Sequence, residues 1–71
     1  MTARGAVRGV VRHFDQHEGL GEIELDDGRI VSFHATQLSD GSRSIAAGTA
    51  VTAELVAWHQ GRIEATSVTI V

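Results

Sequence analysis

The 71-residue chain contains no cysteine and no proline, and its six cationic side chains are all arginine. Without cysteine it can form neither a disulfide framework nor a thiolate metal cluster, so nothing in it requires an oxidising compartment. Long apolar runs are also missing, because Arg4, Arg8 and Arg12 interrupt the N-terminal third. We therefore expect no secretion signal and no membrane span, and the default expectation is a cytoplasmic protein that forms a single domain over residues 1–71.

The charge balance speaks against the simplest kind of nucleic-acid binder. Nine acidic residues face six basic ones, and the formal net charge is −3. A protein that binds phosphate strongly is usually basic. Arginine suits bidentate and stacking contacts better than diffuse attraction, which weakens this objection without removing it.

Five segments have the composition or the period-two alternation of strands, and glycine-containing turns separate several of them. Asp27-Gly28 lies between two such segments and is a strong hairpin signal, because glycine tolerates the positive φ of tight turns. Residues 36–48 are rich in Ser, Asp, Gly and Thr, which predicts a long connection with at most one helical turn. The predicted strands are residues 6–14, 20–26, 29–34, 50–59 and 62–70.

Five short antiparallel strands without a convincing helix predict an all-β fold, a closed five-stranded barrel of the OB type. From Leu20 to Asp26 the alternation places Gly21, Ile23 and Leu25 on the inner face. The side chains expected to be most buried are Val11, Ile23, Val31, Phe33, Val51 and Leu55.

Four motifs resemble the bacterial cold-shock domain, and the spacing of their glycines is kept over about residues 5–71. They are Gly9-Val10-Val11-Arg12-His13-Phe14-Asp15, Glu18-Gly19-Leu20-Gly21-Glu22-Ile23, Asp26-Asp27-Gly28 and Val31-Ser32-Phe33-His34-Ala35. The resemblance implies an OB-fold barrel whose first three strands bind single-stranded nucleic acid by stacking bases on aromatic side chains.

The residues that the resemblance places on this nucleic-acid face are Arg12, His13, Phe14, Leu20, Glu22, Ser32, His34 and Ala35. Only Arg12, Phe14 and His34 match the family's pattern, while the positions of its stacking aromatics carry other residues. Stacking contributes roughly 1 to 3 kcal/mol per base, so losing three or four platforms predicts binding about a thousandfold weaker than that of a typical family member.

Charged side chains on the first two strands have two interpretations. If these strands pair around the turn at residues 15–18, Glu22 lies opposite Arg12, and an ion pair between them would partly occupy the guanidinium of Arg12. Arg4, Arg8 and Arg12 would fall on one strand face and either follow a phosphate backbone or pair with neighbouring carboxylates as a solvated face. Both interpretations are open.

The histidines and the single tryptophan also admit two interpretations. His13 and His34 either contact bases and respond to pH or are surface residues without a role. Trp58 and His59 beside the turn at Gly61 are either a relocated stacking pair or a cover over the end of the barrel.

The sequence gives little support for a catalytic site or a metal site. Ser32 and His34 share a strand face without an orienting carboxylate or nucleophile elbow. His13 and His17 lack further ligands at metal-binding spacing. The pair Gly19 and Gly21 lies in a strand pattern and opens no helix, so it is no phosphate loop. We expect no catalytic residue, no metal and no cofactor.

Two functions follow as hypotheses. The first is a non-catalytic, weak or specialised binder of single-stranded RNA or DNA of the cold-shock type, which influences transcription or translation. The second is an OB-fold module that has lost nucleic-acid binding and binds a protein through the same face. Either would act as a monomer or weak dimer, away from the membrane.

Overall fold

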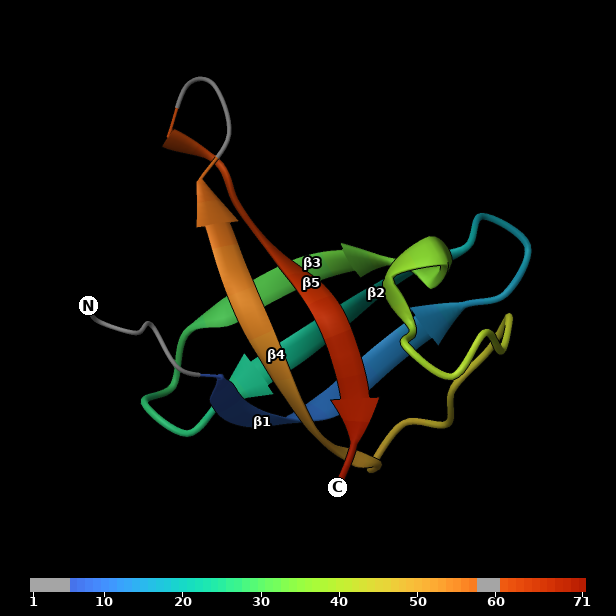
Figure 1. Cartoon of the computed structure of the whole chain (residues 1–71), viewed down its shortest axis with the longest axis horizontal. Coiled ribbons are helices and arrows are strands. Elements are labelled where there is room, and N and C mark those ends of the chain that lie inside the picture. The colour runs from blue at the N-terminus through green and yellow to red at the C-terminus, as the bar shows by residue number, and fades with distance from the viewer. Residues whose placement is uncertain (1–5, 58–60) are drawn as a thin grey trace.

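A computed structural model describes residues 6–57 and 61–71 (Figure 1). Its elements are β1 (Val7–Asp15), β2 (Leu20–Leu25), β3 (Ile30–His34), the 3-10 turn η1 (Ala35–Gln37), β4 (Ala50–Ala57) and β5 (Ile63–Ile70). The predicted strands agree with these bounds to within one residue, except at the end of the fourth. Its predicted last two residues, Trp58 and His59, lie outside the described residues, and so does Arg4.

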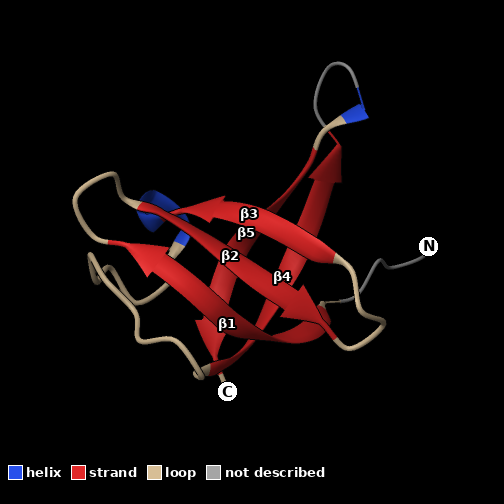
Figure 2. Cartoon of the chain, turned by 180° about the vertical axis from the view of Figure 1, so that it is seen from behind, coloured by secondary structure: helices blue, strands red, loops and turns tan. Residues whose placement is uncertain are grey.

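The strands close into a barrel in the order β1-β2-β3-β5-β4, which confirms the predicted OB-type fold. Four neighbouring pairs are antiparallel, as predicted. The pair of β3 and β5 departs from the expected antiparallel arrangement, since these strands run parallel and meet through Ser32 and Glu64. Figures 1 and 2 show the β4–β5 hairpin crossing the layer formed by β1, β2 and β3. Because β5 lies between β3 and β4 in this order, the segment that connects η1 to β4 must cross one end of the barrel.

The connection after β3 begins with the single turn predicted for this segment. Leu38, directly after η1, is buried and forms a parallel bridge with Val68 of β5. The backbone N–H of Ser39 donates to the carbonyl oxygen of Val68 at 2.8 Å. These contacts hold the beginning of the long connection against β5.

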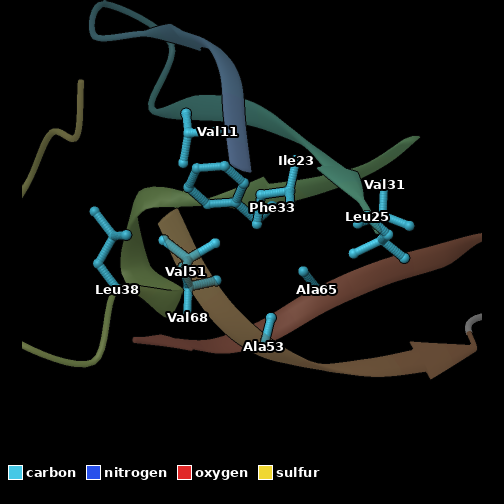
Figure 3. Packing of buried hydrophobic residues seen from close by; sticks show 10 residues of the cluster. All are labelled: Val11, Ile23, Leu25, Val31, Phe33, Leu38, Val51, Ala53, Ala65 and Val68. Carbon is cyan, nitrogen blue, oxygen red and sulfur yellow. The ribbon is translucent and has the colours of Figure 1, made fainter. Parts of the chain in front are cut away.

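Inward-facing side chains of all five strands fill the barrel (Figure 3). The buried hydrophobic residues are Val11, Ile23, Leu25, Val31, Phe33, Leu38, Val51, Ala53, Ala65 and Val68. Five of the six predicted core residues are among them. Leu55 was wrongly placed with the most buried residues, since it is only partly buried and packs against the core from its margin. Leu55 lies near the end of β4. This end projects with β5 beyond the other strands (Figure 1), where fewer side chains can cover it.

Gly21 provides the space in which two phenylalanine rings meet. In the register it lies between Phe14 of β1 and Phe33 of β3. The two rings stack with their centroids 5.9 Å apart and an angle of 24° between their planes. A Cβ atom on Gly21 would lie 2.5 Å from atoms of the Phe33 ring, so no larger residue fits without displacing that ring.

Among residues 6–57 and 61–71, no helix is long and apolar enough to cross a membrane.

Candidate nucleic-acid interface

A β-bulge in β1 sets the positions of the first two predicted site residues. The register with β2 shifts between Val11 and His13, so that His13, and not Arg12, is the partner of Glu22. The prediction that Glu22 lies opposite Arg12 is therefore wrong, because a bulge inserts one extra residue that a period-two pattern does not reveal. Arg12 and His13 are consecutive, and both are exposed.

Arg12 still reaches carboxylates on β2. Its Nε lies 3.9 Å from Oε1 of Glu22, and its Nη1 lies 3.7 Å from Oε1 of Glu24. All three side chains are about half exposed, so each contact contributes little to stability. The two glutamates nevertheless compete with any phosphate for the Arg12 guanidinium.

A cleft of about 450 Å³ lies over the outer side of β1, β2 and β3 and the beginning of β5. We call it the sheet cleft. Five of the predicted site residues line it, namely His13, Leu20, Glu22, Ser32 and His34. Cross-strand register explains this gathering, because His13 pairs with Glu22, Glu22 with Ser32, and Leu20 with His34.

The other three predicted site residues lie elsewhere. Arg12 borders a small hollow beside Val10 and Glu24. Phe14 is partly buried and its ring is stacked on Phe33, so this aromatic ring serves the core. Ala35 lies on a second groove, between the loops.

Acidic groups dominate the sheet cleft. Among the described residues that line it, four carboxylates come from Asp15, Glu18, Glu22 and Glu64, against one guanidinium from Arg62. With His13 and His34 neutral the lining carries a charge of −3, and with both protonated it still carries −1. The potential in this cleft opposes a phosphate backbone at neutral pH.

Sequence reasoning missed Arg62 and Glu64 as lining residues of the sheet cleft. Their place depends on the parallel approach of β5 to β3, which rests on the single register pair of Ser32 with Glu64. No local pattern of turn residues or alternation indicates such a long-range parallel contact. The resemblance extends over about residues 5–71, but it places no site residue on β5.

A second recess of about 540 Å³ separates the β1–β2 turn from the segment that follows η1. We call it the loop groove. Its lining comprises Gln16, His17, Glu18, Gly19, Ala35, Thr36, Leu38, Gly41, Ser42 and Arg43. Glu18 lines both recesses, so the loop groove and the sheet cleft adjoin.

Short hydrogen bonds shape both walls of the loop groove. On one side, Oδ1 of Asp15 accepts from the backbone N–H groups of His17 at 3.0 Å and Glu18 at 3.1 Å. On the other, Oδ1 of Asp40 accepts from Oγ of Ser42 at 2.6 Å and from its N–H at 2.9 Å. The side-chain and backbone hydrogen bonds from Ser42 lower the pKa of Asp40, because they favour its charged form.

Within the described ranges, no group of three His, Cys, Asp or Glu side chains is placed to hold a metal ion.

Comparisons with known proteins find no family model and no curated protein that matches the chain. Among solved structures, the chain is similar to Drosophila Unr CSD456, a structure of cold-shock domains, with a TM-score of 0.81 and 20% sequence identity. The match covers 97% of this chain and 28% of the other, so the chain spans little more than a quarter of the length of that structure. This likeness, together with the closed strand order, shows that the chain has the OB-barrel fold of a cold-shock domain.

Proposed function

We propose that the protein is a non-catalytic binder of single-stranded nucleic acid of the cold-shock type, with low affinity. The observation that carries this proposal is the cold-shock barrel fold, whose outer side here presents two adjoining open recesses. Both recesses are of the size in which proteins hold small ligands.

In this proposal the sheet cleft contributes the contacts to bases. His13 and His34 offer flat rings, and Leu20, which is 40% exposed, offers an apolar surface. Glu22 and Ser32 continue the cross-strand row that begins at His13, and they carry no ring. Because stacking on aromatic side chains supplies much of the affinity of single-strand binders, these residues support weak binding.

The test is a titration of the protein into an end-labelled short oligothymidine at low salt, followed by fluorescence anisotropy. A saturable rise that disappears with added salt supports the proposal. The same titration with a hairpin duplex is the control for single-strand preference. No saturable rise with the single strand, up to millimolar protein, contradicts the proposal.

Restoring rings to the sheet cleft gives a second test. The triple variant Leu20→Phe, Glu22→Phe and Ser32→Phe adds stacking surface and removes one negative charge. We expect it to bind oligothymidine at least tenfold more tightly than the parent chain. If the folded variant shows the parent's affinity, the sheet cleft does not contact bases.

A second candidate function is protein binding by the same face. It is favoured by the net negative lining of the sheet cleft and by the two glutamates beside Arg12. A partner with basic side chains would meet complementary charge there. The titration separates the two functions, because this alternative predicts no salt-sensitive binding of oligothymidine by the parent chain.

A further inference from the structure

We infer that the phosphates of a bound single strand are held in the loop groove, chiefly by Arg43, and not over the sheet cleft. The inference rests on the proposed function and adds the place at which the backbone of the strand is contacted. It departs from the resemblance, which implies binding centred on the face of the first three strands.

The first observation is the contrast in charge between the two recesses. Among the described residues, the sheet cleft brings four carboxylates together with one permanent cation, Arg62. The loop groove has one carboxylate, Glu18, together with Arg43 and His17. With histidines neutral, the lining of the loop groove is balanced while that of the sheet cleft is −3, so a phosphate meets less repulsion between the loops.

The second observation concerns which arginines are available. In the part of the chain that the structure describes, Arg12 pairs with Glu22 and Glu24, and Arg29 pairs with Asp27 at 2.8 Å. No ion pair within the described ranges involves Arg43, which is exposed, and the same is true of Arg8 and Arg62, so it is the lining charge that separates Arg43 from Arg62. A phosphate can therefore bind the guanidinium of Arg43 without first displacing a carboxylate from it.

The third observation is the chemistry of the groove itself. Its apolar part is formed by Ala35 and Leu38, and Gly19 adds a wall without a side chain. Gln16 and Thr36 supply polar side chains at the same recess. Apolar surface beside amide and hydroxyl groups suits a nucleobase, and the adjacent Arg43 suits the phosphate attached to it.

The carboxylates near this groove limit the affinity. Glu18 lines the groove, and Asp40 belongs to the same loop as Arg43. Asp40 is engaged by two hydrogen bonds from Ser42, which hold its carboxylate to its own loop. The expected binding is consequently weak and depends strongly on salt.

The experiment compares two arginines, one from each recess. The slope of log affinity against log salt reports the phosphates neutralised, at about 0.7 per contact for a single strand. For Arg43→Ala, we expect weaker binding of end-labelled oligothymidine and a slope reduced by about 0.7. The matched variant Arg62→Ala removes the same charge from the sheet cleft and is expected to keep the parent's slope. Thermal melts of both variants verify that the fold is intact.

The outcomes distinguish this inference from the proposed function. If the parent chain binds and Arg62→Ala reduces the slope while Arg43→Ala does not, the inference is overturned and nucleic-acid binding stands. Equal reductions in both variants also overturn it, because the backbone would then contact both recesses. If the parent chain binds no oligothymidine at all, the proposed function itself fails.

Discussion

Gly21 is the residue on which the packing of both phenylalanines depends. It is buried between the partners Phe14 and Phe33, and its missing side chain is the room that their rings occupy. A glycine inside a strand usually weakens it, but close approach of neighbouring groups can require one. Here the approach is made by ring atoms that would lie 2.5 Å from an added Cβ.

We therefore expect Gly21→Ala to lower the free energy of unfolding by about 1 to 3 kcal/mol, as overpacking of a core does. Urea unfolding followed by far-UV circular dichroism measures this change. A double-mutant cycle with Phe33→Leu identifies the cause, since the alanine should cost less where the ring is absent. An equal cost in both backgrounds would show that the ring of Phe33 is not what excludes the methyl group.

Phe33 and Leu55 allow a comparison of two predicted core residues that differ in burial. Phe33 is 1% exposed, whereas Leu55 is only partly buried at the margin of the core. Phe33→Ala is expected to cost about 3 to 5 kcal/mol, enough to abolish cooperative unfolding of a chain this short. Leu55→Ala is expected to cost distinctly less and to leave a cooperative transition. Thermal melts decide this, and a Phe33→Ala melting temperature within a few degrees of the parent's would contradict the inward position of the ring.

At the scale of elements, the β2–β3 turn is stabilised by contacts between Asp27 and Arg29, which we call the clamp. Oδ1 of Asp27 accepts from the backbone N–H of Arg29 at 3.0 Å, and Oδ2 accepts from Nε of Arg29 at 2.8 Å. The backbone hydrogen bond is the main cause that lowers the pKa of Asp27, and the side-chain hydrogen bond and the positive charge of Arg29 act in the same direction. The clamp thus stabilises this turn most when the carboxyl group is ionised.

The sign of the resulting pH dependence follows from the lowered pKa. A carboxyl group whose pKa is lower in the folded state contributes stability above its unfolded value of about 3.9 and loses it as pH falls through the folded value. We expect Asp27→Asn to be less stable than the parent at neutral pH and equally stable in strong acid. Urea midpoints of both proteins over this pH range measure the difference. A difference that persists unchanged below the folded pKa would assign the clamp to hydrogen-bond geometry alone.

Element boundaries were predictable wherever alternation and turn residues agreed. In β2 the exposed and buried positions alternate strictly, and the strand ends before the Asp27-Gly28 turn, within one residue of the predicted end. The bulge at Arg12 has no such signal, because neither neighbour is a glycine and both residues of the pair are polar. Its consequence was the wrong partner for Glu22.

The candidate site was predictable only where it lies on consecutive antiparallel strands. His13, Leu20, Glu22, Ser32 and His34 come together because β1, β2 and β3 are neighbours in sequence and in space. The contribution of β5 and the recess between the loops depend on contacts between distant segments, which local patterns do not encode.

For the whole molecule, charge is the property that pH changes most. The formal net charge is −3 with the four histidines neutral and would become +1 with all four protonated. Protonation of an imidazole adds one positive charge, so lowering the pH from about 7.5 to about 5.5 makes the chain less negative. His17 lies in the loop groove, and His13 and His34 lie in the sheet cleft.

We expect the affinity for oligothymidine at fixed low salt to rise over this pH interval, because the added positive charge attracts phosphate. Anisotropy titrations at both pH values measure the rise, and repeating them at high salt should remove most of it. His17→Gln is the informative variant, since it removes the histidine that lines the loop groove and leaves the described lining of the sheet cleft unchanged. Unchanged affinity at both pH values would mean that histidine charge plays no part in binding.

The bulge in β1 has a consequence for how this barrel tolerates changes in length. Arg12 and His13 are consecutive residues that both face outward, while Val11 before them is buried and Phe14 after them is partly buried. Deleting Arg12 would restore a regular alternation and leave Val11 and Phe14 on the inner side, whereas a deletion outside the pair of Arg12 and His13 would turn the following side chains of the strand to the opposite face. The barrel therefore has, within β1, a position where loss of one residue leaves the remaining pattern in phase.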